Sequence, residues 1–433
     1  MLRVFTDMFK NKEIRNRIFF TLVILLIYRL GSAIPAPRID SVKLMAGLGN
    51  NNTLALINML GGGQLQRFSI FSLGVGPYIT ASIVIQMLSM DIIPALSELA
   101  KSGEQGKKQL DKITRYLALV LSFIQAFTLT YAFDIGYSIV RLDGGNPILV
   151  YTYVAVVLTA GTMFLCWLGD RISIQGIGNG VSILIFTGIV SGIPAQFVSI
   201  YETLIASPTA NTGLGILGFV GYALVYVLII ILVIFMTQAT RKIPIQYTSS
   251  SVGRRGNDMT FIPLKINTAS VMPVIFANAI MTAPQTLLSF FKQTSLTTTI
   301  TNVLNFQKPI GFCIYLVLIV VFTFFYTNLQ VDPEKMSENL NKNGSYIVGV
   351  RPGKDTQRYI STILNRITVL GALFITFIAA LPPLMTILFP SLPPSVALGG
   401  TGVIIVVGVA LETMKDLEGK LTQRTYHGFV NKK

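Results

Sequence analysis

Charged residues are scarce in this chain of 433 residues. Asp, Glu, Lys and Arg make up 12% of the sequence and hydrophobic residues 52%, whereas soluble proteins carry about 25% charged residues. The shortage of charge excludes an ordinary soluble enzyme. The hydrophobic content excludes a disordered chain, because disorder requires low hydrophobicity. The sequence therefore predicts an all-α membrane protein that crosses the bilayer several times.

Cysteine and histidine are also rare, with two Cys residues and one His. Cys166 and Cys313 lie in long apolar runs, without a second Cys or His at a metal-ligand spacing. We therefore expect both to be small apolar packing residues. His427 lies in the polar C-terminal tail, so we expect no histidine-based metal site, no metal and no cofactor.

Carboxylates are missing from the middle of every apolar run. Asp91, Asp134 and Glu412 lie at the ends of such runs, and intramembrane carboxylates usually mark proton or sodium coupling. A proton-coupled transporter is therefore disfavoured. The chain also lacks a Walker-type loop, a Ser/His/Asp set and an H-E-x-x-H motif, so we expect no enzymatic activity.

The sequence does contain ten long apolar runs, and a helix needs about 20 apolar residues to cross a bilayer. The runs cover residues 18–36, 73–93, 114–135, 149–168, 176–194, 214–238, 268–289, 308–329, 366–388 and 395–413. When the connecting segments are assigned alternately to the two sides, 27 of the 34 Lys and Arg residues fall on one side. By the positive-inside rule, both termini are cytoplasmic. The first run follows charged residues without a cleavage pattern, which predicts a retained anchor.

Ten spans can divide into two groups of five. Because five is odd, the two halves would enter the membrane in opposite orientations, as in the inverted-repeat folds of many transporters. The sequence shows no clear internal repeat, so the inverted arrangement is a geometric possibility at this stage.

The segment between the first two runs, residues 37–72, is too apolar for a plain loop and too interrupted to cross. Residues 53–60 predict a short helix that three glycines break, after which apolar residues lead into the second run. Irregular backbone at membrane depth occurs only inside protein or beside a water-filled cavity. We expect a re-entrant element here, with an outer loop packed on the surface as the alternative.

Two loops on the basic side are long, at about 239–267 and 330–365. In the first, residues 243–247 and 259–262 predict a β-hairpin with Arg254 and Arg255 at its tip. In the second, Asp332 and Pro333 predict a helix start, Gly344 its end and Asp355 a second start. An arginine pair at a turn tip favours an acidic partner, although the positive-inside bias alone also explains basic loops.

Nine short blocks, in order along almost the whole chain, resemble the SecY/Sec61 alpha family, the pore subunits of the Sec protein-translocation channel. The blocks are Gly31-Ser32-Ala33-Ile34-Pro35, Gly76-Pro77-Tyr78-Ile79-Thr80-Ala81-Ser82-Ile83, Gly161-Thr162-Met163-Phe164, Trp167-Leu168-Gly169, Gly176-Ile177-Gly178-Asn179-Gly180, Pro263-Leu264-Lys265-Ile266-Asn267, Phe325-Tyr326-Thr327, Gly349-Val350-Arg351-Pro352-Gly353 and Gly399-Gly400-Thr401.

This resemblance implies a clamshell of ten transmembrane helices in two inverted halves around a central pore. The halves would be residues 1–195, with a plug at about 53–72, and residues 196–433, with both long loops. An aliphatic ring would narrow the pore. The implied ring residues are Val75, Ile79, Ile185, Ile275 and Ile405, and the implied plug residues are Gly61, Gly62, Gly63, Leu65 and Phe68.

The resemblance also implies a lateral gate formed by the second, third, seventh and eighth helices. Thr80, Gln125 and Asn278 match positions near a polar cluster in that gate. The resemblance also implies docking sites for the motor ATPase SecA or a translating ribosome. The implied docking residues are Arg254, Arg255, Arg351 and Lys354. Further implied partners are the SecE and SecG subunits, signal sequences, nascent polypeptides, a YidC-type insertase and membrane lipid.

The function so implied is a passive protein-conducting channel in the bacterial plasma membrane, which also inserts membrane-protein helices sideways into lipid. Two alternatives remain open at this stage. A small-solute secondary transporter with inverted repeats predicts a polar midplane site, and a membrane scaffold without a pore predicts no re-entrant element.

Overall fold

The computed structural model describes residues 11–41, 43–44, 67–89, 93–141, 146–206, 212–247, 260–288, 295–305, 308–388 and 395–427. Each of the ten predicted apolar runs contains a helix. Seven helices in these residues are long and apolar enough to cross a membrane, and α5 and part of α11 are shorter apolar helices.

Five of these helices precede residue 207 and form the first half. They are α2 (Lys12–Ala33), α5 (Gly76–Leu88), α7 (Gly103–Tyr137), α8 (Pro147–Gln175) and α9 (Gly180–Tyr201), which a π-helical turn, η1 (Glu202–Ala206), extends. A short helix, α6 (Pro94–Lys101), lies between α5 and α7. Pro77 occupies the first turn of α5, where it starts the helix and does not kink it.

The predicted start of the fifth run at residue 176 is wrong, because the glycine-rich block is a loop. Gly178 has a φ of +60°, in the left-handed region that ends a helix. The side chain of Asn179 then accepts hydrogen bonds from the backbone N–H groups of Val181 and Ser182. This N-cap satisfies two of the free donors of the first turn, so α9 begins at Gly180.

The second half contains α10 (Thr212–Gln238), α11 (Met272–Leu288), α13 (Pro309–Gln330), α15 (Lys354–Leu388) and α16 (Ser395–His427). α15 and α16 extend beyond the predicted apolar runs at the end that carries the polar loops. A further helix, α12 (Ser295–Leu304), was not predicted, because its sequence is too polar to read as a span.

The predicted hairpin is confirmed and gains a third strand. β1 (Thr240–Tyr247) pairs antiparallel with β2 (Thr260–Lys265), with Ile243 opposite Ile262. β3 (Ser345–Ile347) pairs with the other edge of β1, so the strand order is β2-β1-β3. Three residues are too few to show a strand period, so the sequence did not predict β3.

The predicted helix at Asp332 is α14 (Pro333–Lys342). The Asp332 carboxylate accepts hydrogen bonds from the N–H groups of Glu334 and Lys335, at 3.0 and 3.4 Å. Isoleucines of the sheet and of the first turns of α15 form a separate hydrophobic cluster, which holds the two loops together. Its buried members include Ile243, Ile245, Ile347, Ile360 and Ile363.

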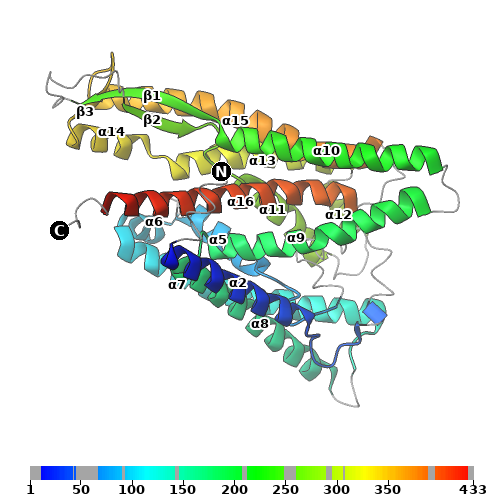
Figure 1. Cartoon of the computed structure of the whole chain (residues 1–433). Helices are drawn as coiled ribbons and strands as arrows, with labels where there is room; N and C mark the ends of the chain where they lie inside the picture. The colour runs from blue at the N-terminus through cyan, green and yellow to red at the C-terminus, as the bar shows by residue number, and fades with distance from the viewer. Residues whose placement is uncertain are drawn as a thin grey trace.

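Figure 1 shows how the two halves are arranged. α2, α7 and α8 lie along one edge, α10, α13 and α15 lie along the other, and α5, α9, α11 and α16 lie between them. The sheet, α14 and α6 lie at the end of the molecule where α2 begins and α16 ends. α9 packs on α16, and α5 packs on α11, so the central helices join the halves.

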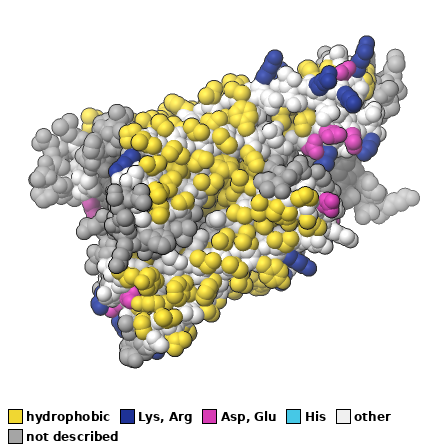
Figure 2. Space-filling view, turned by 180° about the vertical axis from the view of Figure 1, so that it is seen from behind, with side chains coloured by type: hydrophobic (Ala, Val, Ile, Leu, Met, Phe, Trp, Pro, Cys, Tyr) yellow, Lys and Arg dark blue, Asp and Glu magenta, His cyan; other side chains and the backbone are white. Residues whose placement is uncertain are grey.

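The outer surface of the helices is apolar. Phe235 and Leu217 of α10 are among many large hydrophobic side chains that are more than half exposed. Figure 2 shows such side chains along the length of the helices, with the charged ones gathered towards the ends. A soluble protein does not leave so large an apolar surface in water, so this is a multi-span membrane protein.

The two cysteines differ in their surroundings. Both are free, Cys166 is buried and Cys313 is exposed on α13. The expectation of a packing role is confirmed for Cys166. It is wrong for Cys313, which lies on the apolar outer face, where an exposed Cys is as compatible with lipid as any small apolar residue.

Candidate functional site

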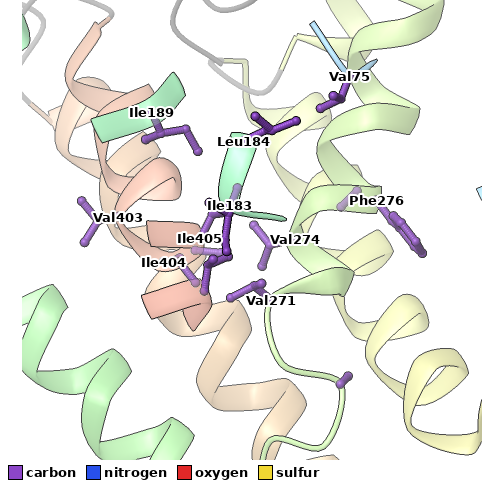
Figure 3. Close-up of a cluster of buried hydrophobic side chains, with 14 of the residues drawn as sticks. Val75, Ile183, Leu184, Ile189, Val271, Val274, Phe276, Val403, Ile404 and Ile405 are labelled. Carbon is purple, nitrogen blue, oxygen red and sulfur yellow. The ribbon is translucent and has the colours of Figure 1, made fainter. Parts of the chain in front are cut away.

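An apolar cluster fills the centre of the molecule, where helices from both halves meet. Val75 lies just before α5, Leu184 on α9, Val274 on α11 and Ile405 on α16, and Figure 3 shows their side chains between these helices. All four are buried aliphatic side chains. Such side chains form a dry constriction against ions and offer no hydrogen bond to a chain that passes.

All five predicted ring residues lie in or against this cluster. Val75 and Ile405 are 8% and 2% exposed. Ile79, Ile185 and Ile275 are half-buried and pack against the same cluster. Ile183, Leu184 and Val274, which the structure places beside them, were missed, because a run of aliphatic residues in the sequence does not tell which ones face inward.

The predicted plug is only partly within the described residues. Gly61, Gly62, Gly63 and Leu65 lie outside them, as does the expected short helix at 53–60. Phe68 is fully buried, but in a different cluster, formed by the segment after α2 and by the ends of α7 and α8 that lie beside it. Its ring meets Phe133 edge to face at 5.9 Å.

Backbone hydrogen bonds hold the segment around Phe68 in place as well. Its carbonyl accepts a hydrogen bond from Ala36 N–H at 2.8 Å, and Ile70 N–H donates to Ile34 O at 3.1 Å. Phe68 adopts a positive φ of 43°, which is uncommon for a bulky residue and persists only where its surroundings fix it. Phe68 is therefore an anchor at the edge of the predicted plug.

The three residues predicted for the gate cluster lie on three helices, α5, α7 and α11. The Thr80 hydroxyl donates to Gly76 O in its own helix at 3.1 Å, and Gln125 is half-buried on α7. Asn278 of α11 interacts with Tyr315 of α13.

A different polar pair joins the halves at this seam. The Tyr326 hydroxyl of α13 donates to Oε1 of Gln86 of α5 at 2.7 Å. The sequence offered one weak signal for this pair, since Tyr326 belongs to one of the nine blocks. Nothing in the sequence paired it with a residue 240 positions earlier.

The glycine-rich loop before α9 is a second junction between the halves. Gly178 N–H donates to Oδ2 of Asp416 of α16 at 3.1 Å, and Ile177 N–H donates to the Thr21 hydroxyl of α2 at 3.3 Å. A side chain at Gly178 would meet Thr413 at 3.1 Å. The loop therefore holds α2, α8 and α16 together at the end that carries the sheet.

The described basic residues of the loops are exposed. Arg351 lies in the turn segment between β3 and α15, and Lys354 is the first residue of α15. Within this segment, Gly349 and Gly353 have φ values of 81° and 96°. The Ser337 hydroxyl of α14 donates to Gly353 O at 2.8 Å, which fixes the turn against α14. Arg254 and Arg255 lie outside the described residues.

Lys415 near the polar end of α16 is an exposed cation. Its ammonium donates to Thr237 O of α10 at 3.3 Å. Desolvation, with a smaller contribution from the charge of Lys265, lowers the pKa of Lys415 below its usual value. Within the described part of the chain, no group of three His, Cys, Asp or Glu residues is placed to hold a metal ion.

Comparisons with known proteins agree with this geometry. The family model of SecY matches residues 69–414. The protein translocase subunits SecY of Staphylococcus aureus and of Staphylococcus carnosus are each 44% identical to this chain over 430 residues, and these cover 99% of both chains in each case.

Solved channel structures share the fold. One described as a protein-conducting channel matches with a TM-score of 0.65 at 18% identity, over 97% of this chain and 95% of its own. Sec61 in the canine ribosome–channel complex from the endoplasmic reticulum matches with a TM-score of 0.62 at 17% identity, over the same shares. The ten-helix clamshell is therefore the fold of this chain, and the match to the family model together with the full-length identity shows that the chain belongs to the SecY family.

Proposed function

We propose that this chain is the pore subunit of a channel that conducts unfolded polypeptides across the bacterial plasma membrane and releases apolar segments sideways into lipid. One observation supports this most strongly: the helices of the two halves meet in an apolar cluster, and every predicted ring residue lies in it or packs against it. The secondary-transporter alternative is not supported, because the curated relatives are protein translocase subunits.

In this proposal, the aliphatic ring closes around a moving chain and limits the passage of ions. The ring residues are Val75, Ile79, Ile185, Ile275 and Ile405. Aliphatic side chains exclude water without binding the chain.

The segment that contains Gly61, Gly62, Gly63 and Leu65 closes the outer side at rest, and Phe68 anchors it. Thr80, Gln125 and Asn278 line the lateral gate. The two halves, about 1–195 and 196–433, separate to open it.

Sideways release follows the transfer energy of the moving segment. A Leu or Ile contributes about −0.5 kcal/mol at the centre of a helix, and a charge there costs about 3 kcal/mol. The chain itself supplies no energy in this scheme, so the driving force comes from a partner. SecE, SecG, a YidC-type insertase and the signal sequence complete the assembly.

The driving partner, SecA or a translating ribosome, docks at the end that carries the sheet, through Arg254, Arg255, Arg351 and Lys354. Two fold relatives support the ribosome as a partner class: canine Sec61 in a ribosome–channel complex and yeast Ssh1 bound to the 80S ribosome. Both termini lie at this end in the proposal, which makes it the cytoplasmic side under the positive-inside rule.

Reconstitution tests this function. Proteoliposomes with this chain and a SecE-type subunit are expected to translocate a secretory precursor when SecA and ATP are added, and not without ATP. Saturable uptake of a small solute by the chain alone, with no precursor translocation, would overturn the proposal in favour of a transporter.

A further inference from the structure

The two halves are joined differently at their two edges. At one edge only residues 207–211 separate η1 from α10, and Nε2 of Gln196 in α9 donates to the Tyr222 hydroxyl in α10 at 3.1 Å. At the other edge α5 packs against α11, which lies far away in the sequence. A separation that pivots on the first edge therefore opens the second edge most.

The hydrogen bond between Tyr326 and Gln86 spans that second edge. Nε2 of Gln86 donates to the Ser82 hydroxyl, one turn earlier in α5, at 3.0 Å. This contact fixes the amide so that its oxygen faces Tyr326, which donates to it at 2.7 Å. The acceptor is therefore oriented in advance by its own helix.

Tyr326 is held equally firmly on the other side of the seam. Its side chain is buried, and its ring meets Phe276 of α11 at a centroid distance of 4.8 Å. The Phe276 ring also packs edge to face on Phe322 of α13 at 6.0 Å. Gln86 thus docks onto a unit formed by α11 and α13 together, so separation of α5 from that unit breaks the hydrogen bond.

The pair lies between the ring and the end of the molecule that carries the sheet. Gln86 follows the ring residue Ile79 by seven positions on α5, which is about 10 Å along a helix. α5 ends two residues later, at Leu88. A chain that enters from the sheet end reaches this pair before it reaches the ring.

We propose that Gln86 and Tyr326 form a polar latch, which holds α5 against α11 and α13 and sets how apolar a segment must be to leave sideways. This inference rests on the proposed function. Polar contacts between membrane helices are modest because each partner finds other contacts when separated. Loss of one such contact shifts an equilibrium between closed and open gates by about threefold to tenfold.

The experiment uses Tyr326→Phe, which removes the hydroxyl and keeps the ring on Phe276. A secretory precursor carries a test segment of graded Leu and Ala content, and the ratio of laterally released to translocated product is measured. At the composition where the unmodified chain gives equal amounts, Tyr326→Phe is expected to raise the ratio about threefold to tenfold. Gln86→Leu is expected to give the same shift, and the double variant no more than either.

Tyr222→Phe is the matched control, because it removes a tyrosine hydroxyl bond between the halves at the covalently joined edge. Its ratio is expected to stay within about twofold of the unmodified chain. The latch is overturned if Tyr326→Phe and Gln86→Leu also stay in that range while a precursor without the test segment is translocated normally. If the unmodified chain translocates no precursor at all, the proposed function fails and not the latch alone.

Discussion

At the scale of single residues, the central cluster acts through the shape of its apolar side chains and not through polar groups. The predicted ring residues in or against it are branched aliphatic side chains, one just before α5 and one each on α5, α9, α11 and α16. Isoleucine is abundant in every span, so residue types alone cannot distinguish an inward-facing Ile79 from one that faces lipid. The resemblance to the family selected the positions, and the structure added the neighbours Leu184 and Val274.

Widening the constriction is expected to let ions through. Ile79→Gly and Ile275→Gly each remove a whole aliphatic side chain, so water enters the gap and the barrier to ions falls. In planar bilayers, the ion conductance of resting channels is expected to rise about tenfold. The control is Val317→Gly, on the outer face of α13 with an exposed fraction of 61%, which carries the same helix penalty of about 1 kcal/mol. Equal conductance for all three variants and the unmodified chain would favour a scaffold without a pore.

At the scale of elements, the features with strong local signals were predicted and those that depend on distant contacts were not. Asp332 with Pro333 marked the start of α14, and the β1–β2 hairpin followed from two short apolar runs around a turn. β3 pairs with the edge of β1 opposite β2, about 100 residues earlier in the chain, and no local pattern records that pairing. The glycine-rich loop was placed inside a helix, since the sequence does not show that Asp416 of α16 holds it.

The turn between β3 and α15 is expected to dock an acidic partner. Arg351→Glu and Lys354→Glu reverse exposed charges on a turn that the contact of Ser337 with Gly353 holds rigid. Affinity for ribosomes or for SecA is expected to fall about tenfold at low salt for each, and the effect to shrink as salt rises. Co-sedimentation of proteoliposomes with each partner measures it.

Lys342→Glu is the matched control for this docking experiment. Lys342 is also exposed, but it lies at the end of α14 and pairs with Glu338 at 3.3 Å. Its reversal is expected to leave the affinity within about twofold, because it lies outside the docking turn and an exposed ion pair contributes little. A general loss of affinity for all three variants would assign the binding to net charge and not to the turn.

At the scale of the whole molecule, the sequence predicted the span count and the asymmetry of charge, because both follow from what a bilayer demands of a helix. It did not predict how the halves touch. Those contacts, Gln86 with Tyr326, Gln196 with Tyr222 and Gly178 with Asp416, join residues 26 to 240 positions apart. In the proposal above, Gln196 with Tyr222 lies at the joined edge and Gln86 with Tyr326 at the edge that opens as a lateral gate.

The most direct test is whether a translocating chain passes through the central cluster. In a background of Cys166→Ala and Cys313→Ala, a single Cys replaces Ile79 or Ile405 in the cluster, or Leu224 on the outer face of α10, which is 66% exposed. A secretory precursor with one Cys is stalled in the channel and oxidised, and the disulfide-linked product is measured. Linkage is expected at Ile79→Cys and Ile405→Cys and not at Leu224→Cys. Stalled precursor that links at Leu224→Cys, or at none of the three positions, would contradict a pore through this cluster.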